Sequence, residues 1–321
     1  MIVVTGTAGF IASCMVQRLL DDGICDIVSV DDFSRRGKQR NFSAKSVLQR
    51  IDRLQFPNWF EEHAEEVDFV IHLGARTDTT EKSWATLLQL NLDYTKSIWN
   101  ICSAYHIPLI YASSAATYGN GKSGYVDRHD IVDELQPLNL YGRSKNEFDK
   151  WALSQKEYPP FWAGVKFFNV YGPNEYHKGR MASVILHAFH EINETGKVNL
   201  FRSHKEEYQD GMQLRDFIYV KDVVSVLRFL MTKLPSSGLY NIGTGRARAF
   251  KDLAIATFKA MERSVNIEYV DMPLDIREKY QYFTEADISK LRNAGYDRPF
   301  YTLEEGVKDY VKHYLIPNTT Y

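Results

Sequence analysis

A tyrosine and a lysine stand four positions apart in the segment that runs from Tyr141 to Lys145. On a helix this spacing puts both side chains on one face. A nearby ammonium favours the phenolate and lowers the tyrosine pKa, so Tyr141 could take a proton from a substrate hydroxyl while a hydride leaves the carbon. The strand end at Ser114 would bring a hydroxyl to the same oxygen. Because such pairs are common on ordinary helix surfaces, this interpretation needs support from other parts of the chain.

Glycines at the first strand-to-helix turn provide that support. Gly6 permits a tight turn, and Gly9 has no Cβ, so a pyrophosphate can approach the backbone at a helix N-terminus. Ala12 stands where a third small residue lets helix and strand pack closely. The turn follows an apolar strand, opens an amphipathic helix and precedes Asp31 at the end of the second strand. This context favours a dinucleotide site over a turn that uses glycine for its geometry alone.

The residues around Asp31 leave the choice between NAD and NADP open. The Asp31 carboxylate would accept hydrogen bonds from the adenosine ribose hydroxyls, which favours NAD. Asp32 adds a second negative charge that opposes a phosphate. The basic residues that follow either hold a 2′-phosphate, which favours NADP, or form a solvated loop: Arg35, Arg36, Lys38 and Arg40.

Short apolar runs alternate with helical patterns in the N-terminal half, which predicts a parallel sheet covered by helices on both faces. We expect strands at 2–5, 27–32, 68–75, 108–114 and 162–171, and helices at 11–20, 83–105 and 141–155. Later in the chain we expect helices at 181–195, 221–233, 251–261 and 303–314, and strands at 198–201, 216–220, 239–242 and 267–270. The polar segment 203–213 is expected to be an exposed loop.

These elements predict an α/β fold, a Rossmann-type doubly wound parallel sheet with a smaller C-terminal α/β lobe for the substrate. The dinucleotide-binding domain would comprise residues 1–170, with returning segments near 214–243 and 284–296. The substrate lobe would comprise 171–213, 244–283 and 297–321. Ligands of such sheets bind at the carboxyl ends of the strands.

Composition argues against several other classes of protein. The chain has 321 residues, 44% of them hydrophobic, and a formal net charge of -2 without a basic stripe, so no nucleic-acid partner is expected. No apolar run approaches the roughly 18 residues that span a bilayer, and the first five residues lack the features of a secretion signal. Cys14, Cys25 and Cys102 are scattered and odd in number. They predict reduced core or near-core thiols in a cytoplasmic protein, and no metal site.

Six stretches carry a family resemblance that runs nearly from end to end. They are YASSAATYG at 111–119, FNVYGP at 168–173, HKGRMAS at 177–183, RDF at 215–217, NIGTGR at 241–246 and YQ at 280–281. On these motifs the chain resembles the extended short-chain dehydrogenase/reductases, and among them the nucleotide-sugar epimerases. The stretch at 177–183 is the most specific. It is similar to that of the group that inverts C6″ of an ADP-linked heptose for the lipopolysaccharide inner core.

The resemblance implies an isomerase that converts ADP-D-glycero-β-D-manno-heptose to its ADP-L-glycero form. C6″ would be oxidised to a transient ketone with tightly held NADP, or with NAD as the alternative, and the same hydride would return to the other face. The positions that match the family's two acid/base residues are Tyr141 and Lys178. A lysine base must lose its charge, so we expect Lys178 to be partly desolvated. Ser114 matches the active-site hydroxyl, and Lys145 would also bind the nicotinamide ribose.

The family's ligand contacts carry over residue by residue. The cofactor contacts are Gly6, Gly9, Phe10, Ile11, Asp31, Asp32, Lys38, Arg53, Leu73, Gly74, Ala75, Arg76, Thr77, Asn91, Lys145 and Val170. The substrate contacts are Asn169, Arg180, His187, Phe201, Arg202, Ser203, His204, Arg215 and Tyr280. Arg215 is the best candidate for the substrate diphosphate, because a guanidinium can bind it bidentately. On residue type alone, His187 could instead be a partly buried histidine, Phe201 a core residue and Tyr280 a packed loop residue.

This sequence departs from the family's pattern at several places, including Ala12 at the third glycine of the turn and a short insertion before Tyr141. Arg76 and Arg180 stand where smaller residues are usual, and the loop between His204 and Arg215 is longer than usual. The loop could reshape the nucleotide end of the site. These departures fit a divergent branch of the family rather than a new activity.

Three alternative functions share the expected fold. A nucleotide-sugar 4,6-dehydratase needs an acidic pair after the active-site hydroxyl, where this chain has Ala115 and Ala116. A UDP-sugar 4-epimerase is the closest alternative, but it typically uses one tyrosine and gives Lys178 no role. A dinucleotide-sensing regulator usually lacks one member of the pair Tyr141 and Lys145. The resemblance also implies a homo-oligomer, with a pentamer as the expected form.

Overall fold

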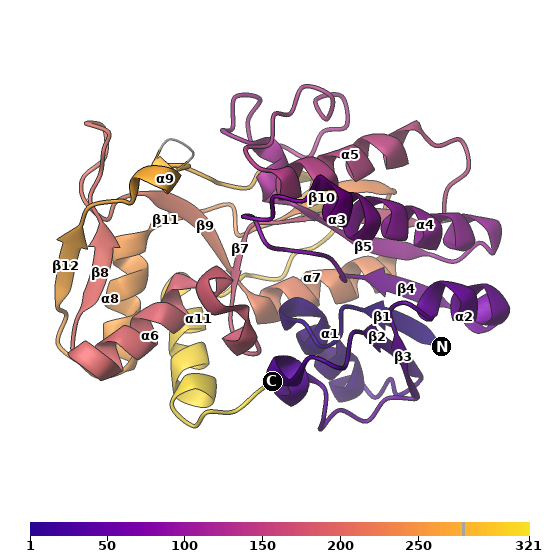
Figure 1. The fold of residues 1–321 in the computed structure, drawn as a ribbon, viewed down its shortest axis with the longest axis horizontal. Helices are drawn as coiled ribbons and strands as arrows, with labels where there is room; N and C mark the ends of the chain where they lie inside the picture. Colours follow the sequence, from indigo (N-terminus) through magenta and orange to yellow (C-terminus); the bar gives the residue numbers. More distant parts are fainter. Residues whose placement is uncertain (278–279) are drawn as a thin grey trace.

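Seven parallel strands form the main sheet of the structure, a computed structural model that describes residues 1–277 and 280–321 (Figure 1). The strands lie in the order β10-β6-β5-β4-β1-β2-β3, and each neighbouring pair is parallel. Their bounds are β1 Ile2–Thr5, β2 Ile27–Asp31, β3 Gln49–Asp52, β4 Phe69–His72, β5 Leu109–Ser114, β6 Trp162–Phe167 and β10 Gly238–Ile242. The prediction of a Rossmann-type parallel sheet is confirmed.

Apolar side chains bury both faces of this sheet, because successive residues of a strand point to opposite sides. Ile2 and Val4 of β1 pack in the core that includes α1 (Phe10–Asp21) and α7 (Val220–Lys233), whereas Val3 packs in the opposite core. The opposite core includes α2 (Phe56–His63), α4 (Tyr94–Ala104) and α5 (Leu140–Ser154). The helices therefore hold the carboxyl ends of the strands in a fixed arrangement.

The C-terminal part adds two small sheets. One has the order β11-β9-β7, with β7 Asn169–Tyr171, β9 Leu214–Tyr219 and β11 Ala247–Ala249. The other pairs β8 Val198–Phe201 with β12 Ile267–Val270 and packs on α6 (Val184–Thr195) and α8 (Phe250–Ala260). Figure 1 shows these elements beside the main sheet, together with α9 (Leu274–Arg277) and α11 (Leu303–Tyr310). The C-terminal part also contains a short helix α10 (Ser289–Asn293).

Some predicted elements differ in detail from the structure. The strand predicted at 162–171 is divided at Phe168, whose N–H donates to the carbonyl of Ile242 at 3.0 Å, so that β7 leaves the main sheet and pairs with β9. The helix predicted at 83–105 contains a π-helical segment, Leu88–Asp93, between α3 (Trp84–Leu87) and α4. Strand β3 was not predicted, since it lies at the sheet edge and only Ile51 of its four residues is buried. Helix α2 (Phe56–His63) was not predicted either.

The cysteine prediction is wrong for one of the three residues. Cys14 and Cys102 are buried, but Cys25 is exposed in the turn before β2. All three are free thiols. Across residues 1–277 and 280–321, none of the helices has the length and apolar character needed to cross a membrane.

Candidate active site

The start of α5 lies against the end of β5, and this contact brings Tyr141 to Ser114. Asn139 caps the helix, because its side chain accepts a hydrogen bond from the Gly142 N–H at 2.7 Å. A Cβ on Gly142 would lie 2.7 Å from the carbonyl oxygen of Ala116. The glycine after Tyr141 therefore allows the helix to begin close to the strand end.

The Tyr141 phenol is held by the Ser114 hydroxyl rather than by the lysine. Ser114 Oγ accepts from the Ala116 N–H at 3.1 Å, which leaves its proton free for the phenol oxygen. Burial raises the pKa of Tyr141, and the hydrogen bond with Ser114 opposes that rise. Lys145 Nζ donates to the carbonyl of Ala112 at 2.8 Å, and burial lowers the pKa of Lys145 to about 8. The expectation that Lys145 lowers the Tyr141 pKa is therefore wrong for this structure.

Lys178 lies beside the glycine turn, on the 3₁₀ segment η5 (Tyr176–Met181) that joins β7 to α6. Its Nζ stands 5.4 Å from the centre of the Phe10 ring, and Phe10 is the first residue of α1. Burial lowers the pKa of Lys178, and the nearby charge of Glu175 opposes this change. A desolvated lysine of this kind can lose and regain a proton near neutral pH more readily than an exposed one.

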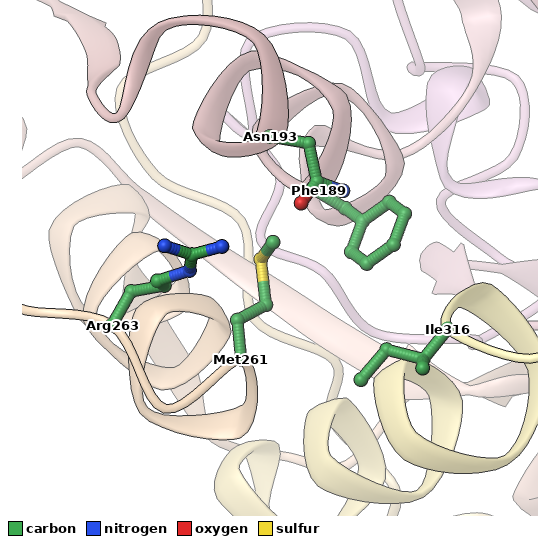
Figure 2. A pocket seen from close by; sticks show the side chains of 5 residues that line it. All are labelled: Phe189, Asn193, Met261, Arg263 and Ile316. Carbon is green, nitrogen blue, oxygen red and sulfur yellow. The ribbon is translucent and has the colours of Figure 1, made fainter.

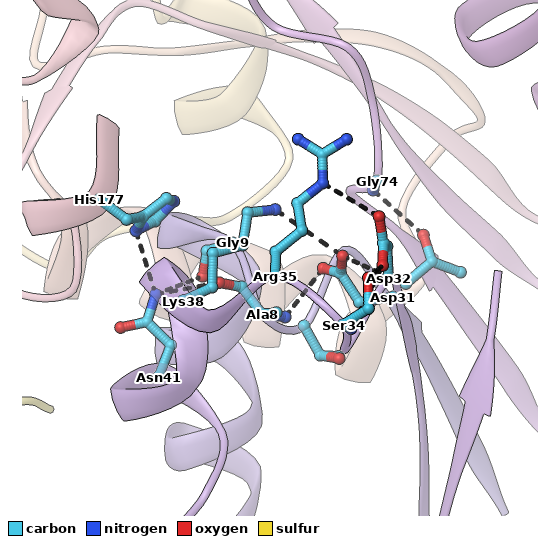
Figure 3. A network of polar contacts seen from close by, with 12 residues as sticks. Ala8, Gly9, Asp31, Asp32, Ser34, Arg35, Lys38, Asn41, Gly74 and His177 are labelled. Atoms are coloured by element: carbon cyan, nitrogen blue, oxygen red, sulfur yellow. Dashed lines mark hydrogen bonds and ion pairs between the residues drawn. The ribbon is translucent and has the colours of Figure 1, made fainter. Parts of the chain in front are cut away.

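The glycine turn is packed too closely for side chains at Gly6 and Gly9. Gly6 has φ +79°, and a Cβ on it would lie 2.7 Å from the backbone nitrogen of Gly74 after β4. A Cβ on Gly9 would lie 2.8 Å from the carbonyl oxygen of Gly6. The Asp31 carboxylate accepts the Ala8 N–H at 2.9 Å, which fixes the turn against the end of β2 (Figure 3). These residues fit a dinucleotide with its pyrophosphate at the start of α1.

Two basic side chains stand next to the acids at the end of β2 (Figure 3). Arg35 Nε donates to Asp32 Oδ2 at 3.0 Å, and Lys38 Nζ lies 3.7 Å from Asp31 Oδ1. Hydrogen bonds from Ser34 and Arg35 lower the pKa of Asp32 to about 2. The negative charge of both carboxylates is thus partly balanced at the place where the adenosine ribose would lie.

Two other basic residues near this site make different contacts. Arg40 donates to the carbonyl of Asn318 at 2.6 Å and lies 4.9 Å from the centre of the Tyr176 ring, so it is removed from the group that could hold a 2′-phosphate. The backbone of Arg53 makes two hydrogen bonds. Its N–H donates to the main-chain carbonyl of Asp31 at 3.1 Å, and its own carbonyl accepts from the Tyr94 hydroxyl at 2.9 Å.

Asn91 holds the loop that follows β4. Its side-chain oxygen accepts from the Arg76 N–H at 2.8 Å, and its amide donates to the Arg76 carbonyl at 3.0 Å and to Ser144 Oγ at 3.0 Å. The Arg76 side chain turns to Glu81, with Nε donating at 3.0 Å. The remaining predicted cofactor contacts lie nearby: Ile11 in α1, Leu73, Ala75 and Thr77 after β4, and Val170 in β7.

Arg215 is a buried guanidinium at the opposite end of the site. Its side chain is 7% exposed, donates to the carbonyls of Leu214 and Gln281, and lies 5.2 Å from the ring centre of Tyr280 and 5.6 Å from that of Phe250. Among the side chains that the structure describes, no ion pair with a carboxylate forms at Arg215. Burial of a guanidinium is unfavourable, so an anionic group such as a diphosphate would stabilise it.

Aromatic rings surround Arg215 on the side of the long loop. Phe201 and Tyr280 make an edge-to-face contact with their ring centres 6.3 Å apart, and the His204 N–H donates to the Tyr282 hydroxyl at 2.8 Å. Phe201, Arg215 and Tyr280 are therefore brought together as predicted for one site. The other predicted substrate contacts have different surroundings: Arg202 is exposed and faces Asp271, Ser203 binds within its own loop, and Asn169 and His187 are exposed on β7 and α6.

Arg180 connects two loops across the site. Its guanidinium donates to the Thr80 hydroxyl in the loop after β4, and the neighbouring Met181 Sδ accepts from Thr79 Oγ1 at 3.6 Å. Arg180 is exposed on η5. The segment that carries Lys178 thus touches the loop that would hold the cofactor.

Sequence reasoning missed two residues that support the site. Asp149 is fully buried on α5, eight residues after Tyr141, and accepts a hydrogen bond from Lys166 Nζ at 2.7 Å. The spacing of Tyr141, Lys145 and Asp149 on one helix face is the signal that could have identified it. Asn41 is also buried, and its amide donates to Ala8 and to Asn174 at 3.1 Å each. It joins the glycine turn to the chain before Lys178, and no local pattern indicates this role.

Two cavities lie away from these residues. One of about 280 Å³ is formed by Phe189, Asn193, Met261, Arg263 and Ile316, between α6, the end of α8 and the C-terminal segment (Figure 2). A second of about 210 Å³ lies near Tyr176 and Tyr310. Arg40, considered above for a 2′-phosphate, lines the second cavity, and the other predicted site residues line neither. In the described part of the chain, no three His, Cys, Asp or Glu side chains are grouped to hold a metal ion.

Known proteins resemble the chain in both sequence and fold. It is 47% identical to an ADP-L-glycero-D-manno-heptose-6-epimerase of Fusobacterium nucleatum over 100% of both chains. It is 46% identical to an enzyme of the same name from Nitratidesulfovibrio vulgaris over 98% of both chains. A crystal structure of the Helicobacter pylori enzyme of that name aligns with TM-score 0.80 and 28% identity, over 97% of this chain and 95% of that one. The model of the NAD dependent epimerase/dehydratase family matches residues 2–243, and the chain therefore belongs to this family.

Proposed function

We propose that this protein inverts C6″ of ADP-D-glycero-β-D-manno-heptose to give the ADP-L-glycero form. The observation that carries the proposal is Lys178, a desolvated lysine next to the glycine turn and separate from the Tyr141 and Ser114 pair. Inversion with one tyrosine requires the ketose to rotate in the site, whereas a second acid/base group on the other face of the carbon removes this requirement. The full-length relatives at 46% and 47% identity carry the name of this activity.

The protein residues divide the work of the reaction. A bound dinucleotide supplies the acceptor for the hydride of C6″ and later its donor. Tyr141 exchanges the proton of the C6″ hydroxyl on one face, and Ser114 holds that oxygen in place with a hydrogen bond. Lys178 exchanges the proton when the transient ketone presents its other face. Lys145 holds the strand end through Ala112 and would bind the nicotinamide ribose.

The Arg215 region fits the nucleotide end of such a substrate. The buried guanidinium offers charge-assisted hydrogen bonds to a diphosphate, and the rings of Phe201 and Tyr280 offer apolar surfaces beside it. We infer that these three residues bind the ADP group. Replacement of Arg215 with Met should raise KM for the ADP-sugar by at least tenfold. This factor corresponds to the binding free energy of about one hydrogen bond to a charged group.

We propose NADP as the cofactor. Arg35 neutralises Asp32, and Lys38 lies close enough to Asp31 to bind a 2′-phosphate beside it. Mass spectrometry of the cofactor released from purified protein tests this, because a 2′-phosphate distinguishes NADP from NAD. Lys38→Ala should weaken binding of NADP but not of NAD, and equal losses for both would contradict the role of Lys38.

The decisive experiment replaces Lys178 with Met. Purified protein is mixed with ADP-D-glycero-β-D-manno-heptose, and inversion at C6″ is followed by NMR. We expect Lys178→Met to lose epimerisation and keep bound cofactor, while the control Lys122→Met, at an exposed lysine, keeps both. Full activity of Lys178→Met would reject the second acid/base group. Inversion of a UDP-sugar at C4 by the wild type, without action on ADP-heptose, would favour the 4-epimerase.

We also propose three properties of the whole protein. The chain divides into a dinucleotide-binding domain of residues 1–170, with returning segments near 214–243 and 284–296, and a substrate lobe of the remainder. It acts in the cytoplasm, without nucleic-acid or membrane partners. It forms a homo-oligomer, a pentamer, whose mass light scattering would measure.

A further inference from the structure

Glu175 is a buried carboxylate that joins both ends of the segment carrying Lys178. It is 1% exposed. Its Oε1 accepts the Gly172 N–H at 3.2 Å and the Ser183 hydroxyl at 2.6 Å, and its Oε2 accepts the Ser183 N–H at 2.6 Å. Gly172 precedes Lys178 by six residues and Ser183 follows it by five. One side chain therefore closes the segment 172–183 into a ring.

The ring is fixed to α6 and faces α11. Ser183 is the N-cap of α6, with its hydroxyl also accepting from the Leu186 N–H at 3.4 Å, and Glu175 faces Tyr310 of α11, whose pKa is raised by burial and by the nearby Glu175 charge. Inside the ring, the Lys178 N–H donates to the main-chain carbonyl of Glu175 at 2.9 Å. The position of Lys178 thus depends on Glu175 in two ways. The main-chain carbonyl of Glu175 binds the Lys178 N–H, and the side chain of Glu175 closes the segment.

Charge adds a second connection between the two residues. Burial raises the pKa of Glu175, and the hydrogen bonds from Ser183 and Gly172 and the charge of Lys178 oppose this rise. Two of those donors are main-chain N–H groups, which can only donate, so they favour the carboxylate. The other titratable groups that face this pair are His177 on η5, Tyr310 on α11 and Cys14 on α1.

We propose that Glu175 is a positioning residue for proton transfer by Lys178, because it closes the segment 172–183 and places a negative charge beside the ammonium. The proposal rests on the function proposed for Lys178. It assigns to Glu175 no contact with substrate or cofactor.

The test measures Lys178 directly and does not depend on turnover. Wild type, Glu175→Gln and the control Glu194→Gln, which removes an exposed carboxylate from α6, are acetylated with trace acetic anhydride at a series of pH values. Peptide mass spectrometry then gives the pKa of Lys178. Glutamine keeps the size of the side chain and one of its two acceptor oxygens and removes the charge, so we expect the Lys178 pKa in Glu175→Gln to fall below the wild-type value, and Glu194→Gln to leave it unchanged.

Opening of the ring has the opposite effect on the same measurement. If Glu175→Gln loosened the segment, water would reach Lys178 and its pKa would rise toward that of a free lysine. A rise or an unchanged value therefore overturns the electrostatic part of the proposal. If Glu175→Gln does not fold, Tyr310→Phe provides a milder change. It removes the hydroxyl that faces Glu175 from α11 and should shift the Lys178 titration, and an unshifted titration overturns the proposal.

Turnover supplies the second readout. In Glu175→Gln we expect kcat for C6″ inversion to fall about tenfold, the usual scale for a misplaced acid/base group, with KM and cofactor binding nearly unchanged. Unchanged kcat with a shifted Lys178 pKa would overturn the positioning role. If the wild type fails to epimerise ADP-heptose, the proposed function fails, but the acetylation measurement still decides whether Glu175 controls Lys178.

Discussion

The backbones of Gly6 and Gly74 are so close that a Cβ on Gly6 would stand 2.7 Å from the Gly74 nitrogen. Gly23 has the same φ of +79° but has open space around its Cβ position. Comparing Gly6→Ala with Gly23→Ala therefore separates backbone strain from the close approach of β1 and β4. Both should lose about 1 kcal/mol from positive φ, and Gly6→Ala about 1–3 kcal/mol more from overpacking. Urea unfolding measures this difference.

The same pair of variants tests the cofactor cradle. Gly6→Ala should also bind the nicotinamide dinucleotide at least tenfold more weakly, since the turn must move to relieve the contact. Gly23→Ala should bind it as the wild type does. Similar behaviour of the two variants would show that the close approach has no role in cofactor binding.

Lys145 should lower the free energy of unfolding of the protein while it supports catalysis. Burial lowers its pKa to about 8 from 10.5, so the folded protein at pH 7 holds a buried ammonium at a cost of about 3 kcal/mol. Because the folded pKa lies below the unfolded one, the cost is fully present below pH 8 and disappears as pH rises toward 10.5. Lys145→Met loses the bond to Ala112, worth about 1 kcal/mol, and should still unfold at a higher temperature than wild type at pH 7.

Activity should change in the opposite direction. Lys145→Met should reduce kcat by about a hundredfold or more, since the variant loses the ammonium that holds the strand end and would bind the nicotinamide ribose. Thermal unfolding at pH 7 and at pH 9.5 provides the check. The stability advantage of the variant should shrink at the higher pH, and a constant difference would mean that Lys145 is not the titrating group.

His72 should make the protein sensitive to acid. Its ring nitrogens lie 2.6 Å from Thr5 Oγ1 and 3.1 Å from Thr95 Oγ1, and burial lowers its pKa to about 3. Between pH 6.5 and pH 3 the unfolded chain binds a proton that the folded chain does not. The free energy of unfolding should therefore fall as the pH decreases through this window. The contribution of His72 is about 1.4 kcal/mol per pH unit.

Replacement of His72 with Gln should make that decline shallower by about one proton, as urea unfolding at pH 6.5, 5.5 and 5.0 would show. The exposed His190 on α6 is the matched control, and His190→Gln should leave the slope as it is. Equal slopes in wild type and His72→Gln would assign the acid sensitivity to other groups.

The ion pair of Asp149 and Lys166 should be a major element of stability around α5. The two side chains are 0% and 1% exposed, and their atoms lie 2.7 Å apart. Lys166→Met would leave a buried carboxylate without its cation and should lower the free energy of unfolding by about 3–5 kcal/mol. Arg128→Met removes an exposed pair with Asp130 and should change little. A small effect of Lys166→Met in urea unfolding would mean that Ser113 and Tyr111, which also donate to Asp149, are sufficient.

Local patterns in the sequence were enough for the elements that carry most of the site. The buried strands β1, β2 and β5 are continuous apolar runs, and the turn at Gly6 and Gly9 has a spacing that few other structures require. Edge strand β3 was not predicted, because Ile51 is the single buried residue of its four and the segment has no apolar run. The division of 162–171 at Phe168 also has no local sign, because it depends on pairing with β9, about fifty residues later.

The class of chemistry follows from the sequence, since Tyr141, Lys145 and the glycine turn lie in short segments whose spacing has a local meaning. The protonation behaviour of those groups depends on the folded chain. Burial rather than Lys145 sets the direction of the Tyr141 pKa, and Glu175 reaches Lys178 through a ring closed by Gly172 and Ser183. The physical reason is that desolvation and closure depend on which distant elements pack together, and no spacing along the chain records this.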